Sequence, residues 1–240
     1  MRINIKNIDL NYIQYGSGKD IILLHGWGQN IEMMKPLGDK LSKEYKITIL
    51  DLPGFGKSSE PVGDFGIYDY SNLLHEFIVA LKIKKPIIIG HSFGGRVAIC
   101  YASKNEVEKL VLFGSPCVRS EKKISLKVRL LKKIIKIPGF KTIGEKLKKY
   151  MGSVDYRNAS EVMRRVLVNT VNEDLSDCAL KITVPTLLIW GDYDTEAPLE
   201  DAKKLELLLK DGGLVVLAGA THYAYLERLP HVIKILNNFL

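Results

Sequence analysis

A single short turn limits what this chain can fold into more than any other stretch. The aliphatic run Ile87-Ile88-Ile89 leads into Gly90-His91-Ser92-Phe93-Gly94, which has the pattern G-x-S-x-G, and small residues typical of a tightly packed helix follow. In this pattern the two glycines let a strand and a helix approach closely, and the serine sits in a strained turn that exposes its hydroxyl. The first N–H groups of the helix point toward any negative charge that develops there. The pattern therefore predicts a reactive serine between a buried strand and a helix.

The rest of the chain repeats this alternation of strand and helix. With 240 residues and 46% hydrophobic content, the chain is long enough for one sizeable core. Continuous apolar runs, typical of parallel strands buried on both faces, are separated by segments with helical periodicity. We expect a pair of strands within residues 2–15 and further strands at 21–24, 46–50, 107–113, 184–190 and 214–217. Helices are expected at residues 31–43, 69–81, 198–209 and 229–240.

This order predicts the α/β class, with a mostly parallel sheet covered by helices on both faces. Residues 117–176 interrupt the alternation, because they contain no strand-like run and show only helical patterns. We therefore expect a core made of residues 1–116 and 177–240, and a helical cap inserted as residues 117–176. The cap is expected on the C-terminal side of the sheet, where open α/β sheets bind ligands.

Three residues that could act together each follow an expected strand. Ser92 follows the run at 87–89, Asp194 follows the run that ends at Trp190, and His222 follows the last strand. Because parallel strands end at the same edge of a sheet, these side chains are expected to meet there. A serine hydroxyl is a poor nucleophile, so it needs a base within reach and a third group that orients the base.

These motifs and their order resemble the α/β-hydrolase family. The matching stretches are residues 25–28, 51–58, 90–95, 185–194 and 219–222, and the resemblance covers nearly the whole chain apart from the insertion. It implies that Ser92 is the nucleophile, His222 the general base and Asp194 the residue that orients His222. It also implies an oxyanion hole made by the backbone N–H groups of Trp27 and Phe93.

Several neighbouring residues compete for these roles or receive structural ones. Asp192 competes with Asp194, and the spacing G-x-x-D of the family selects Asp194. His25 and His91 flank glycine turns and are interpreted as supports for loops, while His231 is expected to be exposed to solvent. The stretch 51–58 is interpreted as a structural turn near the pocket.

The positive charge of the chain is concentrated in the insertion. Of the formal net charge of +8, residues 119–149 supply +10, so the rest of the chain carries −2. Residues 124–137 have an apolar half and a basic half at helical spacing, and residues 140–151 continue as a second basic helix. We favour a cap helix that covers the cleft, with weak contact to an anionic membrane or an acidic carrier as the alternative. Nucleic acid is not an expected partner, because the basic run lacks interleaved aromatic residues.

Composition also bears on compartment and cofactors. The cysteines, Cys100, Cys117 and Cys178, are far apart and odd in number, which suits reduced thiols in the cytoplasm. The N-terminal residues show no signal-peptide pattern, and no apolar run is long enough to cross a membrane. No cofactor is expected, and no cluster of ligand residues with metal-binding spacing is seen.

The expected function is hydrolysis of a small-molecule carboxylic ester with an apolar acyl part, through an acyl-enzyme on Ser92. Ser92 argues against dehalogenases and epoxide hydrolases, whose similar turn carries aspartate. His91 and Tyr223 differ from the Asn and Trp typical of C–C bond hydrolases, which makes that activity a weaker alternative. The pieces at 25–28 and 90–95 look most like small carboxylesterases that release biotin-pathway methyl esters. A thioesterase and a non-catalytic ligand sensor that keeps the same three residues also remain open, and the sequence predicts no oligomeric state.

Overall fold

The computed structural model describes residues 1–118 and 154–240. The expected basic helices at 124–137 and 140–151 lie outside the described residues. In chain order, the strands are β1 (Arg2–Ile5), β2 (Ile8–Gly16), β3 (Lys19–Leu24), β4 (Tyr45–Leu50), β5 (Ile87–His91), β6 (Leu110–Phe113), β7 (Thr186–Gly191) and β8 (Gly212–Leu217). The described helices are α1 (Ile31–Leu41), α2 (Ile67–Ala80), α3 (Phe93–Ala102), α6 (Val154–Asn158), α7 (Glu161–Asn172), α8 (Ser176–Ala179), α9 (Leu199–Leu208), α10 (Ala224–Glu227) and α11 (Leu229–Phe239).

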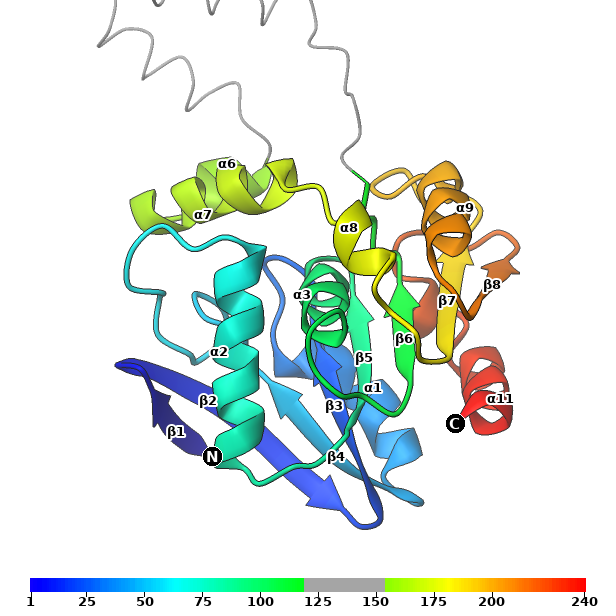
Figure 1. Cartoon of the computed structure of the whole chain (residues 1–240), viewed down its shortest axis with the longest axis horizontal. Coiled ribbons are helices and arrows are strands. Elements are labelled where there is room, and N and C mark those ends of the chain that lie inside the picture. The colour runs from blue at the N-terminus through cyan, green and yellow to red at the C-terminus, as the bar shows by residue number, and fades with distance from the viewer. Residues whose placement is uncertain (119–153) are drawn as a thin grey trace, which may run out of the picture.

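The strands form one sheet in the order β1-β2-β4-β3-β5-β6-β7-β8. The pairs β1–β2 and β2–β4 are antiparallel, and every pair from β4 to β8 is parallel. The expected class, a mostly parallel sheet with helices on both faces, is therefore confirmed (Figure 1). All parallel strands end at one edge, and this edge carries the expected site.

Alternate side chains of each central strand pack on opposite faces of the sheet. Ile22 and Ile88 belong to one core with α2, α3 and α8, whereas Ile21 and Ile89 belong to a second core with α1 and α11. Figure 1 shows the corresponding helices in front of and behind the sheet. Burial on both faces explains why these strands are continuous apolar runs, not alternating ones.

Some boundaries differ from those expected, and each difference has a local cause. Helix α2 begins at Ile67, two residues before the expected start, because Asp69 reaches back to accept a hydrogen bond from the Gly66 N–H (2.8 Å). Strand β6 begins only at Leu110, where its N–H donates to Pro185 O (3.0 Å). The short helix α10 was not expected, because its four residues span too little sequence to show a periodicity.

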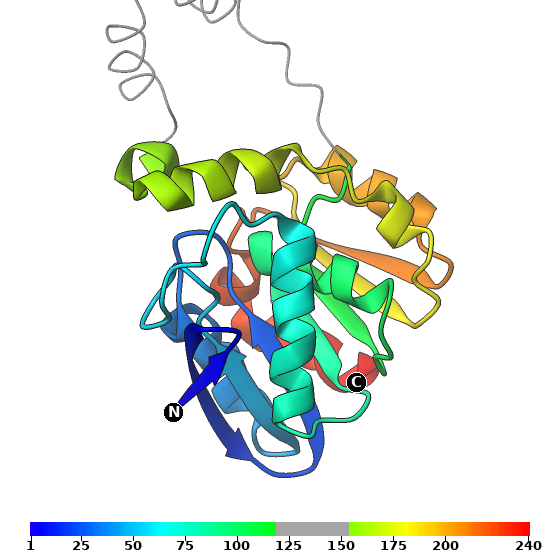
Figure 2. The same cartoon turned by 60° about the vertical axis from the view of Figure 1, so that its left-hand side comes forward.

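The two described ends of the expected insertion meet beside α3. Leu175 N–H donates to Cys117 O (2.9 Å), and α7 lies across the beginnings of α2 and α3 in both views (Figures 1 and 2). Arg96 on α3 joins these segments, since its guanidinium donates to Pro116 O (2.7 Å), Thr170 O (3.0 Å) and Glu173 O (2.6 Å). A buried guanidinium thus holds both sides of the insertion against the helix that follows Ser92.

We predict that Arg96→Met lowers the free energy of unfolding by about 3 kcal/mol, because three carbonyl groups lose their donor while methionine still fills the space. Urea unfolding measures this change. Arg165→Met is the control, because Arg165 is exposed and its ion pairs with Asp64 and Glu161 are worth at most about 1 kcal/mol. A loss below about 1 kcal/mol in Arg96→Met would contradict the role assigned to Arg96.

Candidate active site

Ser92 occupies the strained turn between β5 and α3. Its backbone has φ 49° and ψ −113°, a conformation that costs a residue with a side chain about 1–3 kcal/mol. Two hydrogen bonds hold the turn: Ser92 N–H donates to Phe113 O (2.8 Å), and Arg96 N–H donates to Ser92 O (3.1 Å). The serine is therefore fixed at the end of its strand, half-buried, directly before the first N–H groups of α3.

The glycines around Ser92 are required by close packing. A Cβ on Gly90 would lie 2.5 Å from Gly95 Cα, and a Cβ on Gly94 would lie 2.5 Å from Leu24 O. The first contact shows how closely α3 folds back on β5, and the second how closely it passes β3. Any side chain at either position would push the helix away and move Ser92.

His222 and Asp194 form a buried pair at the same edge of the sheet. His222 Nδ1 lies 2.7 Å from Asp194 Oδ2, and both side chains are almost fully enclosed. The second carboxylate oxygen, Oδ1, accepts the N–H groups of Glu196 (2.9 Å) and Ala197 (2.8 Å). These bonds fix the carboxylate, which in turn orients the imidazole so that Nδ1–H is the donor and Nε2 carries the lone pair.

Asp192, the competitor for this role, has a different task. Its Oδ1 accepts the N–H of Gly219 (2.7 Å), and its side chain is exposed. Asp192 thus ties the loop after β7 to the loop that leads to His222. The structure brings Asp194, and not Asp192, to the histidine ring.

Gly114 connects the serine turn with the histidine pair. It follows Phe113, which accepts the Ser92 N–H, and a Cβ at Gly114 would lie 3.0 Å from His222 Nδ1 and 3.2 Å from Asp194 Oδ2. Its φ of +50° also favours glycine. Sequence reasoning assigned no role to Gly114, although a glycine directly after the strand next to the serine turn was a usable signal.

His91 supports His222 from the other side. The His91 ring lies 4.7 Å from the His222 ring between centroids, and its Nε2 lies 3.0 Å from His222 O. Because a carbonyl oxygen only accepts, His91 Nε2 is the donor. Burial lowers the pKa of His91 to about 3, so the ring is neutral near pH 7. His91 is therefore a support, as interpreted from the sequence, and what it supports is the loop that carries His222.

His25 supports the neighbouring loops in a similar way. Its Nε2 accepts the Leu52 N–H (3.0 Å), and its Nδ1 lies 2.8 Å from Gly26 O. Burial lowers its pKa to about 4. Asp51, next in this network, accepts the N–H groups of Ile31 (2.8 Å) and Lys57 (2.9 Å), which makes residues 51–58 a structural turn.

The two buried histidines predict that the protein loses stability in mild acid. Their folded pKa values, about 4 and about 3, lie below the ordinary value of 6.5, so the unfolded chain binds protons first as the pH falls. Their stabilising effect is complete above pH 6.5 and is lost as the pH falls toward 4. We expect the free energy of unfolding to drop by about 2–4 kcal/mol between pH 7 and pH 5.

Urea unfolding at several pH values measures this drop. His231→Gln is the control, because it removes a histidine that is exposed and lies outside this buried network. A change below about 1 kcal/mol between pH 7 and pH 5 would contradict the neutral state assigned to His25 and His91.

The rings of Trp27 and Phe93, the residue directly after Ser92, contact each other. Their ring centroids are 5.3 Å apart, and both rings contact Phe55, at 4.9 Å and 5.9 Å. Phe93 also contacts Tyr70 at 4.9 Å. The Phe93 N–H is the first of α3, where helix N–H groups have no acceptor within the helix. Phe55 and Tyr70, which the sequence did not single out, make this side of the site aromatic.

A metal cluster and a membrane-spanning helix each require features that can be sought in the part of the chain that the structure describes. No group of three or more His, Cys, Asp or Glu side chains there could hold a metal ion. Among the described helices, none is long and apolar enough to cross a membrane.

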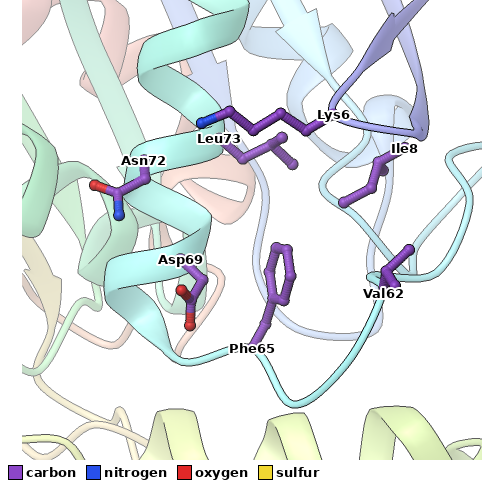
Figure 3. A pocket seen from close by; sticks show the side chains of 7 residues that line it. All are labelled: Lys6, Ile8, Val62, Phe65, Asp69, Asn72 and Leu73. Carbon is purple, nitrogen blue, oxygen red and sulfur yellow. The ribbon is translucent and has the colours of Figure 1, made fainter.

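A separate hollow of about 290 Å³ lies beside the start of α2. It is lined by Lys6, Ile8, Val62, Phe65, Asp69, Asn72 and Leu73, none of which belongs to the group around Ser92 (Figure 3). The charged residues of the lining have partners in the chain, since Lys6 pairs with Glu76 at 2.7 Å and Asp69 binds the Gly66 N–H. The hollow therefore shows no sign of a ligand site.

Comparison with known proteins agrees with the fold. The family described as alpha/beta hydrolase fold matches residues 20–134. A pimeloyl-[acyl-carrier protein] methyl ester esterase of Aliivibrio fischeri is 25% identical over 248 residues, covering 94% of this chain and 95% of the relative. A 2-hydroxy-6-oxo-6-(2'-aminophenyl)hexa-2,4-dienoic acid hydrolase of Metapseudomonas resinovorans is 26% identical over 252 residues, covering 94% and 85%. The enol-lactonase from Burkholderia xenovorans LB400 has a similar structure, with a TM-score of 0.80 at 20% identity over 100% of this chain and 99% of that one.

The family match over residues 20–134 and the similar solved structure show that the chain has the alpha/beta hydrolase fold.

Proposed function

We propose that the protein is a serine hydrolase that cleaves a small-molecule carboxylic ester through an acyl-enzyme intermediate on Ser92. The observation that carries the proposal is the buried His222–Asp194 pair beside the strained turn of Ser92. A histidine oriented by a carboxylate next to a serine in such a turn is the arrangement that activates a hydroxyl.

In the proposed reaction, His222 Nε2 takes the Ser92 proton as the oxygen attacks the ester carbonyl. The same proton then goes to the departing alcohol, and a water molecule releases the acyl group in a second round. Asp194 accepts the Nδ1–H bond throughout and stabilises the imidazolium. The N–H groups of Phe93 and Trp27 would stabilise the oxyanion, each by about 3–4 kcal/mol.

The aromatic side chains around the serine turn support a substrate with an apolar acyl part. Trp27, Phe55, Phe93 and Tyr70 contact one another edge to face, and Met163 of α7 packs against Gly54 in the adjoining loop. An aromatic wall favours aliphatic or aromatic groups and excludes water. The relative from Aliivibrio fischeri, named a methyl ester esterase, supports an ester substrate.

Other kinds of hydrolysis, and ligand sensing without hydrolysis, are the alternatives to this function. The relative from Metapseudomonas resinovorans is named as a hydrolase of a dienoic acid, which supports including C–C bond substrates in a test panel. A thioester in the same panel tests the thioesterase alternative. A ligand sensor would use the same three residues without turnover. We also propose a cytoplasmic location, supported by three buried cysteines without disulfides.

A panel of neutral esters with increasing acyl length tests the proposed function. We predict that wild type hydrolyses part of this panel, that Ser92→Ala lowers kcat by about 10⁴-fold or more, and that Asp194→Asn lowers it by about 10³–10⁴-fold. Asp192→Asn is the matched control, because it keeps the oxygen that binds Gly219 N–H and is expected to retain kcat within about threefold.

Absence of ester hydrolysis by wild type would overturn the proposal, and binding of an ester without turnover would favour a sensor. Equal losses in Asp192→Asn and Asp194→Asn would contradict the role given to Asp194.

A further inference from the structure

Glu196 lies next to the proposed general base, although no motif in the sequence marks it as a site residue. It is the second residue after Asp194, in the loop between β7 and α9. Its N–H donates to Asp194 Oδ1 (2.9 Å), as does the next N–H, that of Ala197 (2.8 Å). The Asp194 carboxylate, which orients His222, therefore also fixes the backbone of Glu196.

The Glu196 side chain reaches the reactive edge of the histidine. Its Oε2 lies 3.6 Å from His222 Nε2, the nitrogen opposite to the one bound by Asp194. The side chain is 64% exposed, so its carboxylate is in contact with solvent. In the proposed reaction, Nε2 delivers its proton to the departing alcohol. That alcohol must therefore pass beside the negative charge of Glu196.

Among the described residues, the two buried histidines near His222 do not offset that charge. His91 and His25 are buried and neutral near pH 7, because burial lowers the pKa of each ring. A second carboxylate, that of Asp155 on α6, lies close to the loop of Trp27, with Oδ1 3.9 Å from the position of a Cβ on Gly28. Glu196 is therefore the carboxylate that the described structure places against His222 Nε2, and Asp155 adds a second carboxylate near the loop of Trp27.

We infer that Glu196 selects the leaving group by charge, so that esters of neutral and cationic alcohols are preferred to esters of anionic alcohols. This inference rests on the proposed ester hydrolysis and names its substrate class. We consider a charge on the alcohol about 6 Å from the carboxylate, with the interaction partly screened by water. A positive charge is expected to raise kcat/KM about three- to tenfold, and a negative charge to lower it by the same factor.

Three butyrate esters of similar size test the inference, because they share one acyl group. Their alcohols are choline, which is cationic, 3,3-dimethylbutanol, which is neutral, and 3-hydroxypropionate, which is anionic. The measured quantity is the ratio of kcat/KM between the cationic and the anionic ester, so any uniform change in rate cancels. We expect Glu196→Gln to lower this ratio about tenfold or more at low ionic strength, and we expect added salt to lower it in wild type.

Glu200→Gln is the matched control, because it removes the same charge from the exposed start of α9, four residues further along the chain. Its ratio is expected to stay within about twofold of wild type. An unchanged ratio in Glu196→Gln, or equal changes of the ratio in both variants, would overturn the inference. In that case, hydrolysis of the neutral ester by wild type would still support the proposed function. Failure of wild type to hydrolyse any of the three esters would overturn the proposed function and the inference together.

Discussion

The backbone of Ser92 is the constraint on which the rest of the site depends. A serine with φ 49° is held there only because its neighbours leave no other conformation. The Phe113 carbonyl fixes its N–H, and the glycines at 90 and 94 let α3 pack against β5 and β3. Gly114, the residue directly after β6, lies close to both His222 and Asp194. The strain is thus balanced by the packing of the sheet edge, and moving any of these elements would displace the serine from the histidine.

A second set of contacts ties the described cap helices to this edge. Arg96, one turn after Ser92, binds carbonyl groups on both sides of the insertion, and Glu173 Oε2 accepts the Ile67 N–H at the start of α2 (2.6 Å). Met163 packs against Gly54 in the loop beside the aromatic cluster. Because these contacts reach the first turns of α2 and α3, the position of α7 and the position of the helix that follows Ser92 depend on each other.

The sequence predicted the fold, and the place of Ser92, Asp194 and His222 at one edge of the sheet, because both depend on local patterns. Buried parallel strands are continuous apolar runs, and a G-x-S-x-G turn after such a run fixes the place of Ser92 at the sheet edge. Gly114 and Glu196 were missed as parts of the site, because the role of Gly114 arises only from contacts with residues about a hundred positions away and the Glu196 side chain leaves an ordinary loop. The catalytic roles of Ser92, Asp194 and His222 remain predictions from the family resemblance, supported by their geometry.

The most direct test of the account is to trap the acyl-enzyme. Wild type mixed with an activated ester of a bulky acid, which deacylates slowly, should release a burst of alcohol equal to the amount of protein. Mass spectrometry of the digested protein should then find one acyl group on the peptide that contains Ser92, and none in Ser92→Ala. Steady turnover without an acyl group on Ser92, or an acyl group on another residue with undiminished activity in Ser92→Ala, would contradict the account.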